Sequence, residues 1–275
     1  MPRIKKKYNF TNGREIWRLI PTKSSKIVIE ERDLKNKEAF YNCVEIDTGK
    51  KIFSNFQLDE KFWTGIEAVE NDVILFHKFL KPDMPVHKGI IAFDIGSKKI
   101  LWENDEFNFL YSTHEKIFCY KQSFEGRNYF TVNIKTGQFL DDLGEDHKLV
   151  NQLKNNLSRQ TENNYLFPES FSELSEVDDD VKSFLQQVRT DYVVIGKIDF
   201  MIYNSVLMCN FHEAADENLL NNKFITIDIN SGKNIFEEVL NKKIKALIPD
   251  SFFMIDDTLF LLKIKMKLLF VQFHS

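Results

Sequence analysis

Cysteine is scarce in this sequence, and its three positions lie far apart. Cys43, Cys119 and Cys209 form no CxxC pair, and each falls within an apolar stretch. An odd number of separated cysteines argues against a disulfide framework and against a zinc site built on thiolates. We therefore expect three buried, reduced thiols.

Long hydrophobic runs and an excess of one charge are also missing. The longest apolar stretches, near 251–262 and 268–271, are far too short to span a bilayer. The start of the sequence, MPRIKKKYNFTNG, is basic but has no apolar run behind it, so we expect no signal peptide. Lys and Arg number 37 against 41 Asp and Glu, a balance that does not indicate nucleic-acid binding. We expect a cytoplasmic monomer with no membrane and no nucleic-acid partner.

Glycine and proline are few, at 10 and 6 residues, for a chain with many short turns. Asn and Asp must therefore supply most turn positions with positive φ. Phenylalanine, by contrast, is abundant at 26 residues, which suits β-strands and a well-filled core.

An internal repeat is the most informative feature that is present. Each copy combines a β-type run, a short turn with a glycine, and a second run that ends in large apolar residues. The turn glycines Gly49, Gly96, Gly137 and Gly232 are 47, 41 and 95 residues apart, so the last gap spans about two periods. The copies are EIDTGKKIF (45–53), AFDIGSKKILW (92–102), VNIKTGQFL (132–140) and TIDINSGKNIF (226–236).

Two further β-type runs precede each copy, which gives four strands in 40–50 residues, the pattern of a propeller blade. A fifth unit, 251–273, has three strands and lacks the fourth. Residues 5–10 (KKKYNF) resemble the fourth strand of the first unit, so we predict that they pair beside 267–273 and close the ring. The sequence thus predicts an all-β fold, a five-bladed β-propeller of four-stranded antiparallel blades that forms a single domain over residues 1–275.

The stretch 145–190 departs from this pattern, because its apolar residues recur at helical spacing. We predict a helical insertion between the third and fourth blades; a degenerate sixth blade of the same length is the alternative. The apolar stripe must be buried, and we expect it to pack against loops around 80–88 and 212–222 as a lid over the propeller axis. The spaced residues are Leu149, Val150, Leu153 and Leu157, then Leu174, Val177, Val181, Phe184, Leu185 and Val188.

The repeat resembles the PQQ-like, or quinoprotein-type, β-propeller repeat, whose pattern is Asp-x-Thr-Gly-Lys-x-apolar-Trp/Phe. The resemblance implies a propeller of a bacterial family without an assigned role, in which the final aromatic packs between blades, and it implies no activity. Quinoprotein dehydrogenases often carry a calcium site and adjacent cysteines; this chain has no adjacent pair, and we expect no cofactor. The matching residues are Asp47-Thr48-Gly49-Lys50 with Phe53, Asp94 with Trp102, Thr136-Gly137, and Asp228 with Ser231-Gly232-Lys233 and Phe236.

Motifs for catalysis or metal binding are not recognisable. The sequence has no GxSxG, GxxxxGK[ST] or GxGxxG. The six histidines show no HxH or HExxH spacing, so a metal site would need ligands from separate blades, and we expect neither catalytic residues nor a metal. The histidines are His77, His87, His114, His147, His212 and His274.

The long connections (80–88, 123–128, 212–222 and the insertion) all fall on one face of the predicted propeller, where loops tend to carry function. We expect a non-catalytic binding or scaffold protein that presents this face and the insertion to a protein or peptide. The alternative is a small-ligand or carbohydrate-active enzyme that uses the axial pocket. The candidate ligand-binding residues are His87, Arg127, His212, Glu213 and Asp216.

Overall fold

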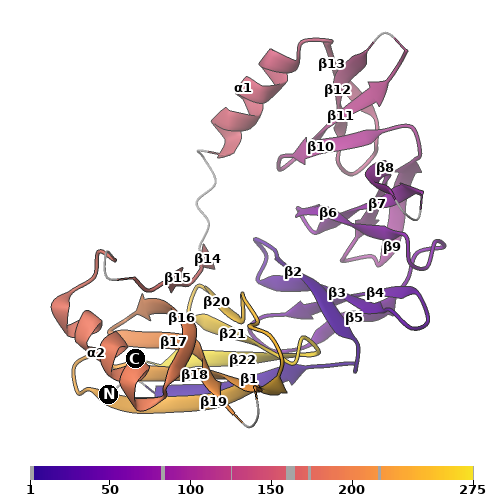
Figure 1. Ribbon diagram of the computed structural model, residues 1–275. Coiled ribbons are helices and arrows are strands. Elements are labelled where there is room, and N and C mark those ends of the chain that lie inside the picture. The colour runs from indigo at the N-terminus through magenta and orange to yellow at the C-terminus, as the bar shows by residue number, and fades with distance from the viewer. Residues whose placement is uncertain are drawn as a thin grey trace. The chain divides into compact units, whose positions relative to one another are not determined.

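The computed structural model describes residues 3–81, 84–124, 126–158, 165–172, 175–215 and 218–274. These residues form five antiparallel sheets and two helices (Figure 1). The chain divides into two compact units, one made of Met1–Gly13 with Asn163–Ser275 and the other of Arg14–Glu162.

The unit Arg14–Glu162 contains three sheets in which each strand pairs with the next one along the chain. This meander order is that of a propeller blade. The first sheet holds β2 (Glu15–Pro21), β3 (Lys26–Asp33), β4 (Glu38–Glu45) and β5 (Lys51–Phe56); the second holds β6 (Thr64–Glu70), β7 (Val73–Lys81), β8 (Met84–Asp94) and β9 (Lys99–Asn104); the third holds β10 (Asn108–Ser112), β11 (Lys116–Gln122), β12 (Arg127–Asn133) and β13 (Phe139–Gly144).

The tight turns between strands use several of the residues that the composition predicted. Asn71 and Asp72 between β6 and β7 have φ of 48° and 59°, values typical of a two-residue hairpin turn. Gly49 and Gly137 in the repeat turns have φ of 71° and 68°. Asn and Asp thus serve at several positive-φ positions, but the prediction that they supply most of them is wrong: among the described residues, glycine, lysine and serine together take the larger share.

Large side chains of alternate strand positions fill the space between neighbouring sheets. Tyr41 of the first sheet lies 4.5 Å from Phe76 of the second, measured between ring centroids, and both are fully buried. The opposite face of the second sheet packs through Leu75 and Ala92 against Ile117 and Val132 of the third. Each sheet therefore stabilises its neighbour by burying one full apolar face.

The other unit contains the fourth and fifth sheets. The fourth has the order β15 (Glu169–Ser170), β16 (Val194–Tyr203), β17 (Val206–Ala214), β18 (Leu220–Asp228) and β19 (Lys233–Ile244). The fifth has the order β1 (Arg3–Phe10), β22 (Lys267–His274), β21 (Thr258–Lys263), β20 (Phe252–Ile255) and β14 (Tyr165–Leu166). Residues 5–10 thus pair beside 267–273, the pairing that the sequence predicts, with Tyr8 opposite Phe270 and Phe10 opposite Leu268.

Two helices follow the third sheet in the chain, α1 (His147–Ser158) and α2 (Asp179–Asp191). The stripe of α2 is buried through Val181, Leu185 and Val188, which pack on Leu207 and Phe211 of the fourth sheet. For loop 212–222 the expected packing of this stripe is wrong in the described residues, because the stripe buries itself on the apolar sheet face instead. Loop 80–88 belongs to the other unit, and its contact with the stripe stays a prediction. Leu174 of the predicted stripe lies outside the described residues.

The predicted all-β fold of four-stranded antiparallel blades is confirmed, with short added strands in two of the sheets. The single ring of five blades and the assignment of 145–190 as an insertion stay predictions. In the part of the chain that is described, neither helix is long and apolar enough to cross a membrane.

Candidate functional site

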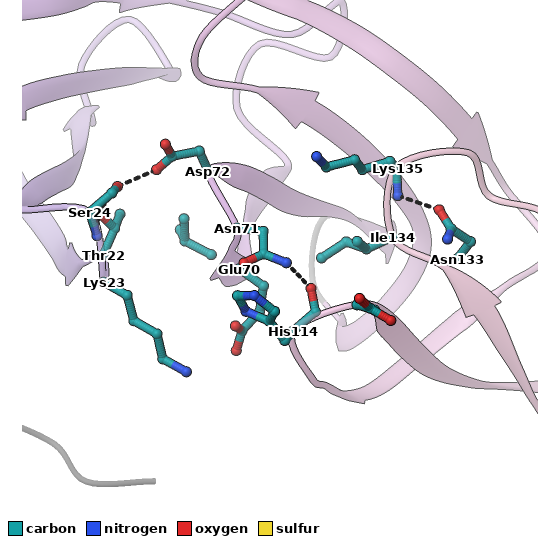
Figure 2. Close-up of a pocket in the computed structure, with 12 residues that line it drawn as sticks. Thr22, Lys23, Ser24, Glu70, Asn71, Asp72, His114, Asn133, Ile134 and Lys135 are labelled. Carbon is teal, nitrogen blue, oxygen red and sulfur yellow. Dashed lines mark hydrogen bonds between the residues drawn. The ribbon is translucent and has the colours of Figure 1, made fainter.

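A pocket of about 760 Å³ lies where the tight turns of the first three sheets meet (Figure 2). The turn residues 22–24, 69–72 and 114–115 line it, together with 133–135 from the repeat turn of the third sheet. These are the short turns, so this pocket lies at the opposite ends of the strands from the long connections that the sequence favoured. The turns converge because each connects the first two strands, or the last two, of successive blades.

Hydrogen bonds between neighbouring sheets hold these turns in place. The Ser24 hydroxyl donates to the Asp72 carboxylate, and Lys26 Nζ lies 2.6 Å from the other oxygen of that carboxylate. Farther along, Asn71 Nδ2 donates to the backbone carbonyl of His114. The pocket wall is therefore built from polar groups that already have partners, which makes the cavity rigid.

The charged side chains that remain in this pocket are of both signs. Besides Asp72, the titratable residues that line it are Lys23, Glu70, His114, Glu115 and Lys135, and within the described residues no ion pair engages Lys23, Glu70, Glu115 or Lys135. Burial raises the pKa of Glu70, although the nearby charges of Lys23 and His114 act in the opposite direction. Glu70 therefore keeps its proton to a higher pH than an exposed glutamate does.

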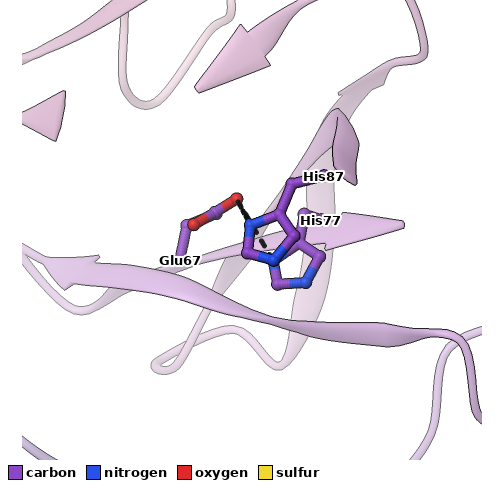
Figure 3. Close-up of side chains that lie close together, drawn as sticks. All are labelled: Glu67, His77 and His87. Atoms are coloured by element: carbon purple, nitrogen blue, oxygen red, sulfur yellow. Dashed lines mark hydrogen bonds and ion pairs between the residues drawn. The ribbon is translucent and has the colours of Figure 1, made fainter. Parts of the chain in front are cut away.

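A second group of functional side chains lies on the second sheet alone: Glu67 of β6, His77 of β7 and His87 of β8 (Figure 3). One carboxylate oxygen, Glu67 Oε1, lies 2.7 Å from His87 Nδ1 and 3.2 Å from His77 Nδ1. The two imidazole rings are stacked with their centroids 3.6 Å apart and their planes at 8°. All three ligand atoms lie within 4.8 Å of one another.

Irregularities in the sheet bring these side chains together. The β6–β7 register shifts between Ile66 and Ala68, so that Glu67 sits at a bulge, a feature that re-aims a side chain. Gly65, opposite His77, is the cradle of the ring: a Cβ at this position would lie 2.7 Å from His77 Cε1. Any side chain larger than hydrogen at residue 65 would displace the imidazole.

His77 is 1% exposed, and neither of its ring nitrogens has a hydrogen-bond partner. Its Nδ1 is near Glu67 without the alignment of a hydrogen bond. Burial lowers the pKa of His77, and Glu67 only partly offsets this. Burial would raise the pKa of Glu67, but the two histidines outweigh it and lower that pKa. Near neutral pH the group therefore holds a carboxylate beside a neutral buried imidazole.

Four of the five residues that the sequence singled out as ligand-binding have local partners. His87 belongs to the group just described, and Arg127 lies over the Tyr120 ring, 4.5 Å from its centroid. His212 Nε2 accepts a hydrogen bond from the Ile248 amide, and Glu213 lies 3.2 Å from Lys223 Nζ. Asp216 lies outside the described residues.

Sequence analysis missed Glu67 and His77, because it expected ligands from separate blades. The structure assembles the group from three adjacent strands of one sheet. The register of the β7–β8 hairpin is the feature that could have revealed His77 and His87 as neighbours. Phe79 pairs with His87, which places His87 diagonally across from His77 on the same face of the sheet. No spacing rule reveals Glu67, since its position depends on the bulge.

Stability at acid pH is expected to depend on His212. Burial lowers the pKa of this histidine below its ordinary 6.5, and the charge of Asp199 only partly offsets it. As pH falls below about 6.5, the unfolded state binds the proton before the folded state does, so the free energy of unfolding decreases. His212→Gln keeps an acceptor for the Ile248 amide but does not titrate. Urea unfolding at pH 7.5 and 5.5 should show a smaller loss of stability in this variant than in the wild type.

The matched control is His147→Gln, which replaces an exposed histidine of α1. This control should keep the wild-type pH dependence. Equal pH dependence in His212→Gln and the wild type would contradict the assignment of His212 as a buried neutral acceptor.

Comparisons with known proteins give a partial family match and distant structural likenesses. A family model described as a domain of unknown function (DUF4905) matches residues 20–102. No curated protein matches the sequence. Among solved structures, an uncharacterized protein from Listeria monocytogenes EGD-e is similar at 10% identity and TM-score 0.33, over 90% of this chain and 91% of that one.

Two further similar structures are named for their fold or activity. The β-propeller domain of the Trilobed protease from Pyrococcus furiosus has 9% identity and TM-score 0.33, over 94% of this chain and 68% of that one. A europium-containing methanol dehydrogenase has 10% identity and TM-score 0.29, over 88% of this chain. The present chain spans only 45% of that dehydrogenase's length. Likenesses of this size establish no shared activity.

Proposed function

We propose that the chain is a non-catalytic binding protein that holds a short charged peptide segment of a protein partner in the pocket at the tight turns. The observation that carries the proposal is a set of lining side chains that no ion pair engages within the described residues, in a pocket whose walls are already hydrogen-bonded: Lys23, Glu70, Glu115 and Lys135. A pocket that is already formed loses little conformational entropy when a ligand binds. The rigid sheets hold this pocket in shape before binding. In this proposal the PQQ-like repeat is a scaffold only.

The chemistry of the lining favours a peptide over an apolar ligand. Among the described residues that line it, only Val69 and Ile134 have apolar side chains. The turn backbones and the charges of both signs complement a peptide's amides and charged side chains. The apolar stripe of α2 is buried on the fourth sheet, so it is not available to a partner. We therefore place the partner at the tight turns.

The cellular location belongs to the same proposal. Cys43, Cys119 and Cys209 are unpaired and buried, as predicted, and burial raises the pKa of Cys43 to about 12. Such thiols are unreactive and suit a reducing compartment. We propose a cytoplasmic location.

A second candidate function, a carbohydrate-active enzyme, is favoured by one observation. Glu70, with its raised pKa, shares the pocket with Asp72, which Lys26 holds in an ion pair. Two carboxyl groups in one pocket, one of them with a raised pKa, are the kind of pair that glycoside hydrolysis uses. A panel of nitrophenyl glycosides tests this alternative. If the wild type hydrolyses one of these glycosides and Glu70→Gln abolishes that hydrolysis, the enzyme proposal would replace the binding proposal.

The binding proposal is tested with peptides selected on the full chain from a random phage-displayed library. The selected peptides should carry charges of both signs, and the double variant Lys23→Glu, Lys135→Glu should bind them at least about tenfold more weakly, since like charges meet in the pocket. The control Lys99→Glu reverses an exposed charge on β9, outside the pocket, and should bind like the wild type. Selection of no peptide, or equal weakening by Lys99→Glu, would overturn the proposal.

A further inference from the structure

We propose that Glu67, His77 and His87 form a binding site for one divalent transition-metal ion, with zinc as the ion to test. The proposal concerns the second sheet alone and is independent of the peptide pocket. Two imidazole nitrogens and one carboxylate oxygen converge there from three adjacent strands.

The donor set selects the class of ion. Imidazole nitrogen suits zinc, copper, nickel and iron, whereas magnesium and calcium prefer sites made of oxygen atoms alone. Two histidines and one carboxylate give zinc three protein ligands and leave a fourth position for water or another small ligand. Access to that position is provided by His87, whose side chain is 36% exposed.

The distances already approach those of a coordination sphere. With zinc–donor bonds of about 2.0–2.1 Å, two donors of a tetrahedral site are ~3.3 Å apart. Glu67 Oε1 lies 3.2 Å from His77 Nδ1 and 2.7 Å from His87 Nδ1. A small outward movement of His87 would therefore make room for an ion between these donors.

His77 provides an independent observation that points to a ligand. It is 1% exposed, and both ring nitrogens are buried without a hydrogen bond. Leaving such polar atoms unpaired in the interior is costly. The Gly65 cradle nevertheless fixes the ring with Nδ1 toward the Glu67 carboxylate, and coordination through Nδ1 would satisfy this nitrogen.

The stacking of the two rings predicts which side chain moves. Because the ring planes are at 8° and the ring centroids are 3.6 Å apart, the two Nδ1 atoms point along nearly parallel planes and not toward one point. An ion shared by both requires one ring to turn. His77 is buried against Gly65, so the half-exposed His87 is the ring expected to rotate.

The charges around the group are compatible with a cation. Arg18 of the first sheet donates to the backbone carbonyl of Ile66 and so brings a positive charge near the group. That charge opposes a metal ion, and the Glu67 carboxylate, which lies within 3.2 Å of both histidines, offsets it.

The test is titration of the tag-free, chelator-treated full chain with zinc chloride by isothermal calorimetry. One zinc ion per chain should bind, and Glu67→Gln and His87→Ala should each weaken binding at least about 100-fold, since removing a ligand costs more than removing a group that supports one. The control His147→Ala replaces an exposed histidine of α1 and should bind zinc like the wild type. Cobalt in place of zinc should give the visible absorption of a tetrahedral site.

A second measurement separates metal binding from a merely structural role. His77→Ala is avoided because it empties a buried position; His87 is half-exposed, so its variant should fold. Zinc should raise the Tm of the wild type and leave that of His87→Ala unchanged. Absence of zinc binding by the wild type, wild-type zinc affinity retained in both site variants, or magnesium binding as tight as zinc would overturn the proposal. In that case the carboxylate shared by two histidines is only a structural ion pair.

Discussion

Deletion of residues 1–10 is expected to lower the Tm by about 10 °C or more. Strand β1 pairs with β22 along its length, and Phe10 at its end is 2% exposed. Tyr8 packs on Phe270 with ring centroids 4.1 Å apart, and Lys6 Nζ lies 2.6 Å from Glu238. Loss of a buried phenylalanine alone costs about 3–5 kcal/mol, and each kcal/mol lowers the Tm of a chain of this size by about 2–4 °C.

The deletion also exposes the edge of the fifth sheet, because β22 loses its outer partner. Such an edge invites intermolecular pairing, so aggregation at raised temperature should accompany the lower Tm. Hydrogen exchange measured by mass spectrometry should be faster in β20, β21 and β22 and unchanged in β6–β9, which belong to the other unit. The control Lys5→Ala, at an exposed position of β1, should keep the wild-type Tm within about 2 °C. An unchanged Tm after the deletion would show that β1 contributes nothing to the fifth sheet.

The strand content and strand order were predictable because they depend on local chemistry. Each repeat combines a positive-φ turn, such as Gly137, with β-branched and aromatic runs of strand length. The aromatic that ends the repeat was also predictable: Phe53 lies 5.4 Å from Phe93 of the next sheet, and Phe236 packs in the core shared with the fifth. Because side chains of a strand alternate between the two faces of its sheet, an apolar residue at this position can be buried only against the neighbouring sheet.

The candidate sites were not predictable, because they depend on register and on the meeting of separate turns. A bulge positions Glu67, and no residue preference marks a bulge in this strand. The pocket is formed by turns about 45 residues apart, Lys23, Glu70 and His114, whose side chains have no common motif. The docking of α2 was missed for a similar reason: helical spacing shows which face is apolar and does not show which surface will cover it.

Trp102→Ala is expected to lower the free energy of unfolding by about 2–3 kcal/mol, somewhat less than the 3–5 kcal/mol of a fully buried aromatic, because the indole is only half-buried. Trp102 ends the second repeat and packs in the core between the second and third sheets. Its Nε1 donates to the Ile134 carbonyl at 2.9 Å, so the variant loses a hydrogen bond between sheets as well as contact area. Urea unfolding followed by circular dichroism measures the difference.

Gly137 shows whether the indole occupies the place assigned to it. A Cβ at residue 137 would lie 2.7 Å from Trp102 Cδ2, and the φ of 68° is unfavourable for alanine on its own. Gly137→Ala should therefore cost about 3 kcal/mol in the wild type but only about 1 kcal/mol, the backbone part, once Trp102 is alanine. The double-mutant cycle isolates the clash between the turn of the third repeat and the aromatic of the second, a contact that exists only if neighbouring blades pack in repeat register. Additive costs would mean that the indole lies elsewhere, and that the repeat does not fix how one blade meets the next.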